Sequence, residues 1–71
     1  MKNLMFTKHR VNKGLSQDKL ASQLGICKDY VNMIENNKRT PSLILAKRIA
    51  DLFETTVDHL FFYSHKEQNL S

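Results

Sequence analysis

Apolar residues recur along this chain at intervals of three and four positions, and Gly, Asn and Pro residues separate the resulting segments. The pattern predicts five helices, over about residues 4–13, 17–24, 28–36, 43–53 and 57–61. Ser16, Ser42 and Thr56 each precede one of these helices, where a hydroxyl accepts a hydrogen bond from a free N–H of the first turn. Gly14 and Gly25 end the first two helices, because glycine adopts the left-handed conformation that stops a helix. An all-helical fold follows.

The second and third predicted helices carry the spacing that two short helices need when they cross at a steep angle. Ala21 is small enough to stand where the two axes approach, and Gly25 permits the tight turn between them. Val31 and Ile34 are branched residues that pack the later helix onto the earlier one. The other apolar positions of this stretch are Leu20, Leu24 and Ile26. The arrangement is typical of a helix-turn-helix, whose second helix fits the major groove of DNA.

The third predicted helix has an apolar side and a polar side. At about 100° per residue, Tyr30, Val31 and Ile34 cluster on the side that faces inward. Glu35 lies at the border of this cluster, half turned toward the core. The outward side holds Lys28, Asp29, Asn32, Met33 and Asn36. These outward residues are the ones expected to meet DNA.

The fourth predicted helix is apolar over about half of its circumference, which suits a central packing helix with some area left for a partner. It is followed by the run Leu60-Phe61-Phe62-Tyr63, the densest aromatic cluster in the chain. In an extended segment, these residues would place two side chains on each face. We expect one domain over residues 1–63 that ends in this dimerisation segment, and a flexible tail over residues 64–71.

Charged residues are distributed unevenly along the chain. Residues 1–48 hold ten basic and three acidic side chains, whereas residues 49–71 hold one basic and four acidic ones, for a formal net charge of +4. A basic first part indicates a surface for phosphate groups and leaves a second surface for another partner. The alternative is that both parts are ordinary solvated surfaces.

The composition argues against several classes of protein. No stretch of about 18 apolar residues is present to span a membrane, and the single Cys27 has no partner for an intramolecular disulfide. One thiol and three scattered histidines make no metal-binding pattern. No catalytic grouping or phosphate-cradling glycine loop appears. We therefore expect a cytoplasmic protein that needs no cofactor and is not an enzyme.

Residues 4–61 resemble the lambda-repressor/Cro-like, or xenobiotic-response-element-type, helix-turn-helix family. The matching pieces, in the family order, are Arg10, LSQDKLASQLGI, YVNMIENNKRTPS, LAKRIADLF and VDHLF. The chain looks most like the short stand-alone bacterial and phage regulators, which implies a compact five-helix, all-α domain. The resemblance further implies a homodimeric repressor that binds an inverted repeat in double-stranded DNA and needs no small-molecule effector.

The resemblance also implies which residues read the DNA bases. Those that fall where family members contact base edges are Lys28, Asp29, Asn32 and Met33. Lys28 can donate to guanine, and Asn32 can pair with adenine or donate to a phosphate. Asp29 either accepts from cytosine or serves as an acidic residue at a helix N-terminus. Met33 either contacts a thymine methyl group or only shields the helix.

A second set of residues matches the family's contacts to the DNA backbone: Gln17, Tyr30, Asn36, Lys38 and Arg39. Gln17 resembles a glutamine that bonds a phosphate and braces the recognition helix. Tyr30 either brings its hydroxyl near a phosphate or packs in the core. The alternative for Asn36, Lys38 and Arg39 is an ordinary solvated loop. Several phosphate contacts would make DNA binding depend steeply on salt.

Two further groups match structural parts of the family. Arg10 and Glu35 correspond to a partly buried ion pair that joins the first helix to the recognition helix, and the border position of Glu35 allows such a pair. Pairing of two copies is expected at the C-terminal apolar residues. These are Val57, Leu60, Phe61, Phe62 and Tyr63.

Three residues depart from the family pattern. Cys27 stands where Ser, Thr or Asp usually caps the recognition helix, and we expect a small half-buried residue there rather than a redox sensor. Glu54 replaces the glycine that usually ends the fourth helix, so this turn is expected to be strained or differently shaped. His9 replaces a larger apolar residue and is expected to be a satisfied boundary histidine, with a mild effect of pH as the alternative.

Two other functions fit the same fold. The chain would be an antitoxin or a control protein if the gene of a toxin or a methyltransferase lay beside its own. It would be a protein-interaction module if it bound no duplex more tightly than bulk DNA. The basic first part of the chain and the cations of the loop after the third helix argue against this second alternative.

Overall fold

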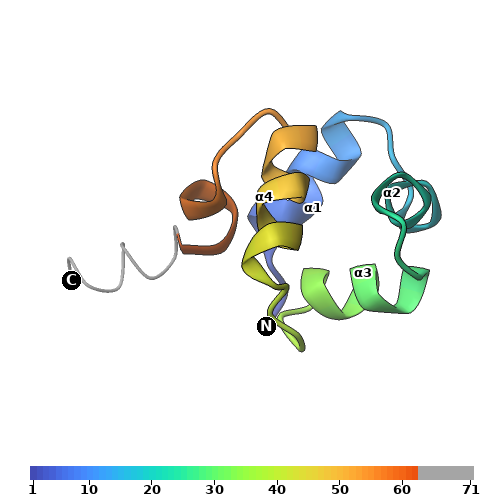
Figure 1. Cartoon of the computed structure of the whole chain (residues 1–71), viewed down its shortest axis with the longest axis horizontal. Helices are drawn as coiled ribbons and strands as arrows, with labels where there is room; N and C mark the ends of the chain where they lie inside the picture. Colours follow the sequence, from blue (N-terminus) through green and yellow to red (C-terminus); the bar gives the residue numbers. More distant parts are fainter. Residues whose placement is uncertain (63–71) are drawn as a thin grey trace.

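Residues 1–62 are the part of the chain that the computed structural model describes, and they fold into five helical segments. These are α1 (Leu4–Asn12), α2 (Gln17–Leu24), α3 (Lys28–Glu35), α4 (Leu43–Leu52) and η1 (Asp58–Phe62), a π-helical turn (Figure 1). Within residues 1–62 there is no strand, and the predicted all-α, five-helix fold is confirmed. None of the helices in this range is both long and apolar enough to cross a membrane.

Polar side chains determine where these helices begin. The side-chain oxygens of Asn3, Ser16, Ser42 and Thr56 each accept a hydrogen bond from the N–H three residues later. Each such bond satisfies one of the free N–H groups of a first turn and is worth about 1 kcal/mol. At the other end of α2, Gly25 has a φ of 71°, the left-handed value expected for it. The caps predicted at Ser16, Ser42 and Thr56 are confirmed.

One apolar side of each helix faces a common core. Phe6 of α1, Leu20 of α2, Val31 of α3 and Ile49 of α4 are each 0% exposed. The ring of Phe6 meets the ring of Phe53 edge to face, with 5.4 Å between the centroids. Burying one side chain of this size stabilises the fold by about 1.5–3 kcal/mol. Packing therefore maintains helices that are too short to be stable in isolation.

The C-terminal segment is helical as far as the structure describes it, which agrees with the helix predicted over about residues 57–61 and not with an extended run over residues 60–63. The π-helical turn η1 includes Leu60, Phe61 and Phe62. Leu60 is 2% exposed, and its carbonyl oxygen accepts a hydrogen bond from Asn3 Nδ2 at 2.9 Å. This long-range tie holds η1 against α1, so the expectation of an extended segment is wrong for residues 60–62. Tyr63 and the predicted tail, residues 64–71, lie outside the described residues.

Two turns have left-handed backbone at residues other than glycine. Asn37 follows α3 and has a φ of 60°. Glu54 follows α4 and has a φ of 59°. Asparagine tolerates this conformation better than glutamate does, since its short side chain can bond to nearby backbone. The expectation of a strained turn at Glu54 is confirmed.

Candidate nucleic-acid interface

The pair formed by α2 and α3 presents one helix to the outside and holds it with the other. Figure 1 shows α3 running along one edge of the molecule, while α2 is seen nearly end-on beside it. Ala21, Val31 and Ile34 are at most 3% exposed where the two helices meet. Gly25 makes the turn between them, so the crossing follows from the spacing read in the sequence.

The outward side of α3 carries four exposed side chains of different chemistry. They are Lys28, Asp29, Asn32 and Met33. Together they offer a cation, a carboxylate, an amide and a thioether within less than two helical turns. Asp29 lies in the first turn of α3, where its negative charge interacts favourably with the positive end of the helix dipole. Such a row of mixed hydrogen-bonding groups suits the edges of base pairs in a major groove.

Behind this row, the carboxylate of Glu35 is buried and heavily hydrogen bonded. Glu35 is 1% exposed. Arg10 donates to it twice, from Nε to Oε1 at 2.9 Å and from Nη2 to Oε2 at 3.1 Å. Thr7 Oγ1 donates to Oε2 at 2.6 Å. Burial raises the pKa of Glu35, but the hydrogen bonds from Arg10, Thr7 and Gln17 outweigh it and hold this pKa below its usual value.

Gln17 connects this buried carboxylate to the outer face of α3. Its Nε2 donates to Glu35 Oε1 at 3.2 Å, and its Oε1 accepts from Asn32 Nδ2 at 3.3 Å. The three residues belong to α2 and α3, and Arg10 and Thr7 extend the network into α1. Sequence reasoning paired Arg10 with Glu35 but missed Thr7 and the bond between Gln17 and Asn32. The only signal for Thr7 is its position one turn before Arg10, on the same side of α1.

The loop after α3 holds the remaining candidate phosphate contacts. Lys38 and Arg39 are exposed, and their N–H groups donate to the carbonyl oxygen of Met33 in the last part of α3. The Arg39 guanidinium lies 5.9 Å from the centre of the half-buried Tyr30 ring, within the range of a cation–π contact. Asn36 Nδ2 donates to the backbone carbonyl oxygen of Asn32 at 2.9 Å. This loop therefore presents two cations directly beside the outer face of α3.

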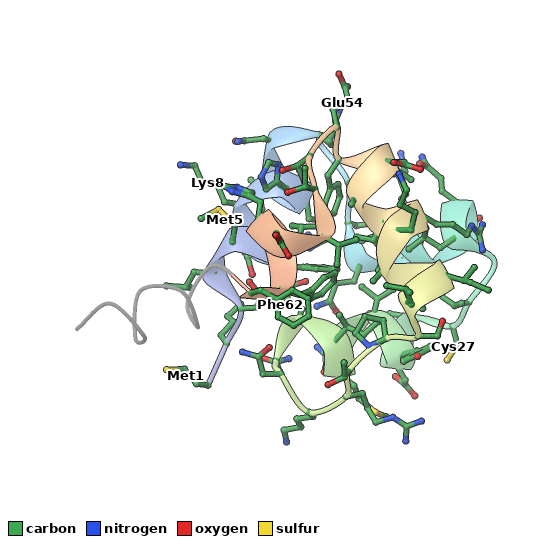
Figure 2. All side chains as sticks on the ribbon, turned by 60° about the vertical axis from the view of Figure 1, so that its left-hand side comes forward. Met1, Met5, Lys8, Cys27, Glu54 and Phe62 are labelled. Atoms are coloured by element: carbon green, nitrogen blue, oxygen red, sulfur yellow. The ribbon has the colours of Figure 1, made fainter. Side chains whose placement is uncertain are left out.

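Cys27 is exposed, so the expectation of a half-buried residue there is wrong. Its backbone has the extended conformation of an N-cap residue, with φ −85° and ψ 157°, yet its side chain makes no capping hydrogen bond. Figure 2 shows Cys27 on the far side of the molecule from Met1, projecting outward from the start of α3. A short side chain at the outer start of a helix has nothing to pack against, which explains its exposure.

The C-terminal residues proposed for pairing differ in their exposure. Leu60 belongs to the core, while Val57 and Phe61 are half-buried and pack against it. Phe62 is 47% exposed and lies on the outer surface of η1 (Figure 2). At the start of α4, Leu43 and Ile44 are 78% and 77% exposed, which leaves the apolar area expected on that helix.

His9 stands at the boundary between α1, η1 and the turn after α4. Its ring stacks on Phe53 with 5.7 Å between centroids and meets His59 edge to face at 5.2 Å. Burial and the charges of His59 and nearby lysines lower the pKa of His9. The histidine is therefore part of the aromatic packing at this junction. Among residues 1–62, no group of three His, Cys, Asp or Glu side chains is placed to hold a metal ion.

Comparison with known proteins gives a consistent picture. A protein-family model described as helix-turn-helix matches residues 8–60. An uncharacterized HTH-type transcriptional regulator of Archaeoglobus fulgidus is 33% identical over 58 residues, which cover 82% of this chain and 83% of that protein. An uncharacterized HTH-type transcriptional regulator of Methanocaldococcus jannaschii is 36% identical over 59 residues, which cover 83% of this chain and 89% of that protein. The regulator YqaF of Bacillus subtilis is 41% identical over 44 residues, covering 62% and 58%.

Proposed function

The chain belongs to the Cro/C1-type helix-turn-helix family of DNA-binding transcriptional regulators, and we propose that two copies bind an inverted-repeat operator and repress transcription. The observation that carries the proposal is the outer face of α3, with four chemically different side chains exposed side by side. A surface of this kind suits sequence reading, whereas binding to DNA in general requires only positive charge.

Within the proposed complex, α3 lies in the major groove and its exposed side chains read bases. Lys28 donates to guanine O6 and N7, and Asp29 accepts from a cytosine amino group. Met33 contacts a thymine methyl group, and Asn32 supplies an amide to an adenine. Each good contact of this type is worth about 1–3 kcal/mol of discrimination against a wrong base.

The residues that flank this face bind the DNA backbone in our proposal. They are Gln17, Tyr30, Asn36, Lys38 and Arg39. The two cations of the loop supply all of the positive charge of this set, and the cation–π contact between Arg39 and Tyr30 orients one of them. Backbone contacts fix the register of α3 on the duplex and carry no sequence information themselves.

Two copies pair in this proposal through the C-terminal apolar residues Val57, Leu60, Phe61, Phe62 and Tyr63. The exposure of Phe62 supports such a contact, while Leu60 would act from within the core by holding η1 in place. A two-fold pair sets its recognition helices about 34–36 Å apart, one turn of DNA, and so requires an inverted repeat. Binding at such a site within a promoter would exclude the polymerase.

Selection of bound duplexes from a random DNA library tests this function. The purified chain should recover one short sequence, arranged as an inverted repeat with half-site centres about one turn apart. Lys28→Ala should relax the preference at one position of each half-site and leave the others unchanged. A Lys28→Ala chain with the wild-type preference at every position would refute base reading by Lys28. Recovery of unrelated sequences by the wild-type chain would refute the function.

A further inference from the structure

We propose that the buried carboxylate of Glu35, acting through Gln17, fixes the orientation of the Asn32 amide and thereby makes Asn32 a reader of adenine rather than guanine. The inference rests on the proposed function, because it takes the outer face of α3 to be the DNA-reading surface. Glu35 and Gln17 are positioning residues in this scheme, and only Asn32 touches a base. We name the chain Glu35–Gln17–Asn32 the amide relay.

The relay starts at a group that can only accept hydrogen bonds. Glu35 receives four of them, two from Arg10 and one each from Thr7 and Gln17. Every partner is a donor, and the positive charge of Arg10 lies against the carboxylate. The carboxylate therefore stays ionised near neutral pH, in agreement with the lowered pKa of Glu35. An ionised carboxylate has no hydrogen to give, which determines the direction of every bond that follows.

The second link is the amide of Gln17, which has one donating end and one accepting end. Because Glu35 only accepts, Gln17 must turn its NH₂ group toward Glu35, as the 3.2 Å bond from Nε2 to Oε1 records. The Oε1 of Gln17 is then left on its other side as an acceptor. The only orientation of Asn32 that satisfies this acceptor places the Asn32 NH₂ group against it, at 3.3 Å.

The third link determines what Asn32 can offer to DNA. One N–H of Asn32 is used by Gln17, so Oδ1 and the second N–H are available to a base. Adenine presents a matching pair in the major groove, the N6 donor and the N7 acceptor. Guanine presents two acceptors, O6 and N7, and its O6 would oppose Asn32 Oδ1. The neighbouring Asn36 bonds to the backbone carbonyl of Asn32 and does not compete for the amide.

If the Asn32 amide were reversed, it would accept from Gln17 and present only N–H groups to the DNA. Such a surface favours guanine, whose major-groove edge has two acceptors. The base read at this position is therefore determined by a charge that never touches DNA. A side chain in place of Gln17 that only donates should reverse the preference, and one that neither donates nor accepts should abolish it.

The experiment measures the base preference at one position of the selected site. Asn32→Ala first identifies which position Asn32 reads, because its preference alone should disappear. Competition binding then compares duplexes with adenine or guanine at that position, for the wild type and for Gln17→Met and Gln17→Lys. Methionine removes both relay bonds at similar length, while lysine donates to Glu35 and to Asn32 Oδ1. Gln23→Met and Gln23→Lys are matched controls, since Gln23 is exposed on the same helix.

We expect the wild type to prefer adenine by about tenfold or more. Gln17→Met should bring the ratio of the affinities for the adenine and guanine duplexes close to one, and Gln17→Lys should favour guanine. Both Gln23 controls should keep the wild-type ratio. Loss of a phosphate contact at Gln17 lowers affinity for all sequences alike, so it cannot move this ratio. Melting curves should show all variants folded, since Arg10 stays paired with Glu35 in each and the lysine variant adds a second cation there.

A measurement with wild-type protein alone complements the variants. Purine in place of the adenine lacks the N6 amino group and should weaken wild-type binding by about tenfold. An adenine preference that survives in both Gln17 variants, a wild-type preference for guanine at the Asn32 position, or full binding to the purine duplex would overturn the relay alone. Failure of the wild type to select any common sequence would instead overturn the proposed function, and the relay with it.

Discussion

At the scale of single residues, Glu35 has two roles that depend on the same charge. It holds α1 to α3 through Arg10 and Thr7, and it reaches the outer face of α3 through Gln17. Burying a carboxylate is costly unless donors surround it, and here each of its oxygens accepts two hydrogen bonds. The same donors keep it ionised, so stability and the orientation of Asn32 have a common origin.

The buried ion pair of Arg10 and Glu35 should contribute measurably to the stability of the fold. Arg10→Met should lower the free energy of unfolding by about 3 kcal/mol, because it leaves a buried charge without its partner. The double change Arg10→Met with Glu35→Met should cost clearly less, since no buried charge is left. Chemical denaturation of the two variants and the wild type at neutral pH measures both values. Equal losses in the single and the double variant would contradict the account.

The lowered pKa of Glu35 gives this contribution a pH dependence. The folded state holds the Glu35 proton less tightly than the unfolded state, whose carboxyl pKa is near 4.5. The stabilisation is therefore complete above that value and is lost as the pH falls through the lower folded pKa. The stability difference between the wild type and the Arg10→Met, Glu35→Met variant should shrink on acidification. A stability difference that stays constant from neutral to strongly acidic pH would contradict this pH dependence.

At Cys27, a single substitution is predicted to raise the free energy of unfolding rather than to lower it. Its backbone already has the geometry of an N-cap, but its side chain makes no capping bond. Cys27→Ser should supply that bond and raise the free energy of unfolding by about 1 kcal/mol. Cys27→Ala is the control, because it removes the thiol without adding an acceptor, and it should not stabilise. The same denaturation experiment decides, and a serine variant no more stable than the alanine one would refute the capping argument.

At the scale of elements, the turn after α4 is the clearest strained feature. Glu54 has a φ of 59°, and the exposed contact of its carboxylate with Lys13 Nζ gives little in return. Glu54→Gly should raise the melting temperature by about 4 °C, because glycine adopts this conformation without a steric penalty. Glu54→Gln keeps the strain and loses only the ion pair, so it should melt no higher than the wild type. Equal melting of the glycine and glutamine variants would contradict the strain.

The elements also show what the sequence could predict. Helix positions and caps were predictable because Ser16, Gly25 and Ser42 act on residues within one turn. The hydrogen bond from Asn3 to the Leu60 carbonyl oxygen was not, since the two residues lie 57 positions apart in the chain. The bond between Gln17 and Asn32 likewise requires the crossing of α2 and α3. Local patterns therefore predicted the exposed face of α3 but not the network behind it.

At the scale of the whole molecule, η1 and α2 lie on opposite sides of α1 and α4 (Figure 1). A surface for pairing at η1 would therefore leave the pair of α2 and α3 open to DNA. The exposed apolar residues available for such a contact include Phe62 on η1 and Leu43 with Ile44 on α4. In our proposal the first of these is used.

Single lysine substitutions distinguish the two surfaces. Phe62→Lys should shift the chain from dimer to monomer, because it places a charge in an apolar contact. Leu43→Lys, which is the matched change on α4, should leave the dimer intact. Sedimentation equilibrium measures the oligomeric state of both variants. A dimer that survives Phe62→Lys and dissociates with Leu43→Lys would move the interface to α4.

In our proposal, the outer face of α3 reads DNA sequence while the loop after it binds phosphate. Fluorescence anisotropy with the selected duplex and a shuffled duplex, each titrated at several salt concentrations, tests this proposal most directly. The selected duplex should bind at least about a thousandfold more tightly, and affinity for both should fall steeply with salt. Lys38→Ala should reduce that salt dependence by about one unit of slope. Equal affinity for the two duplexes would contradict the proposal.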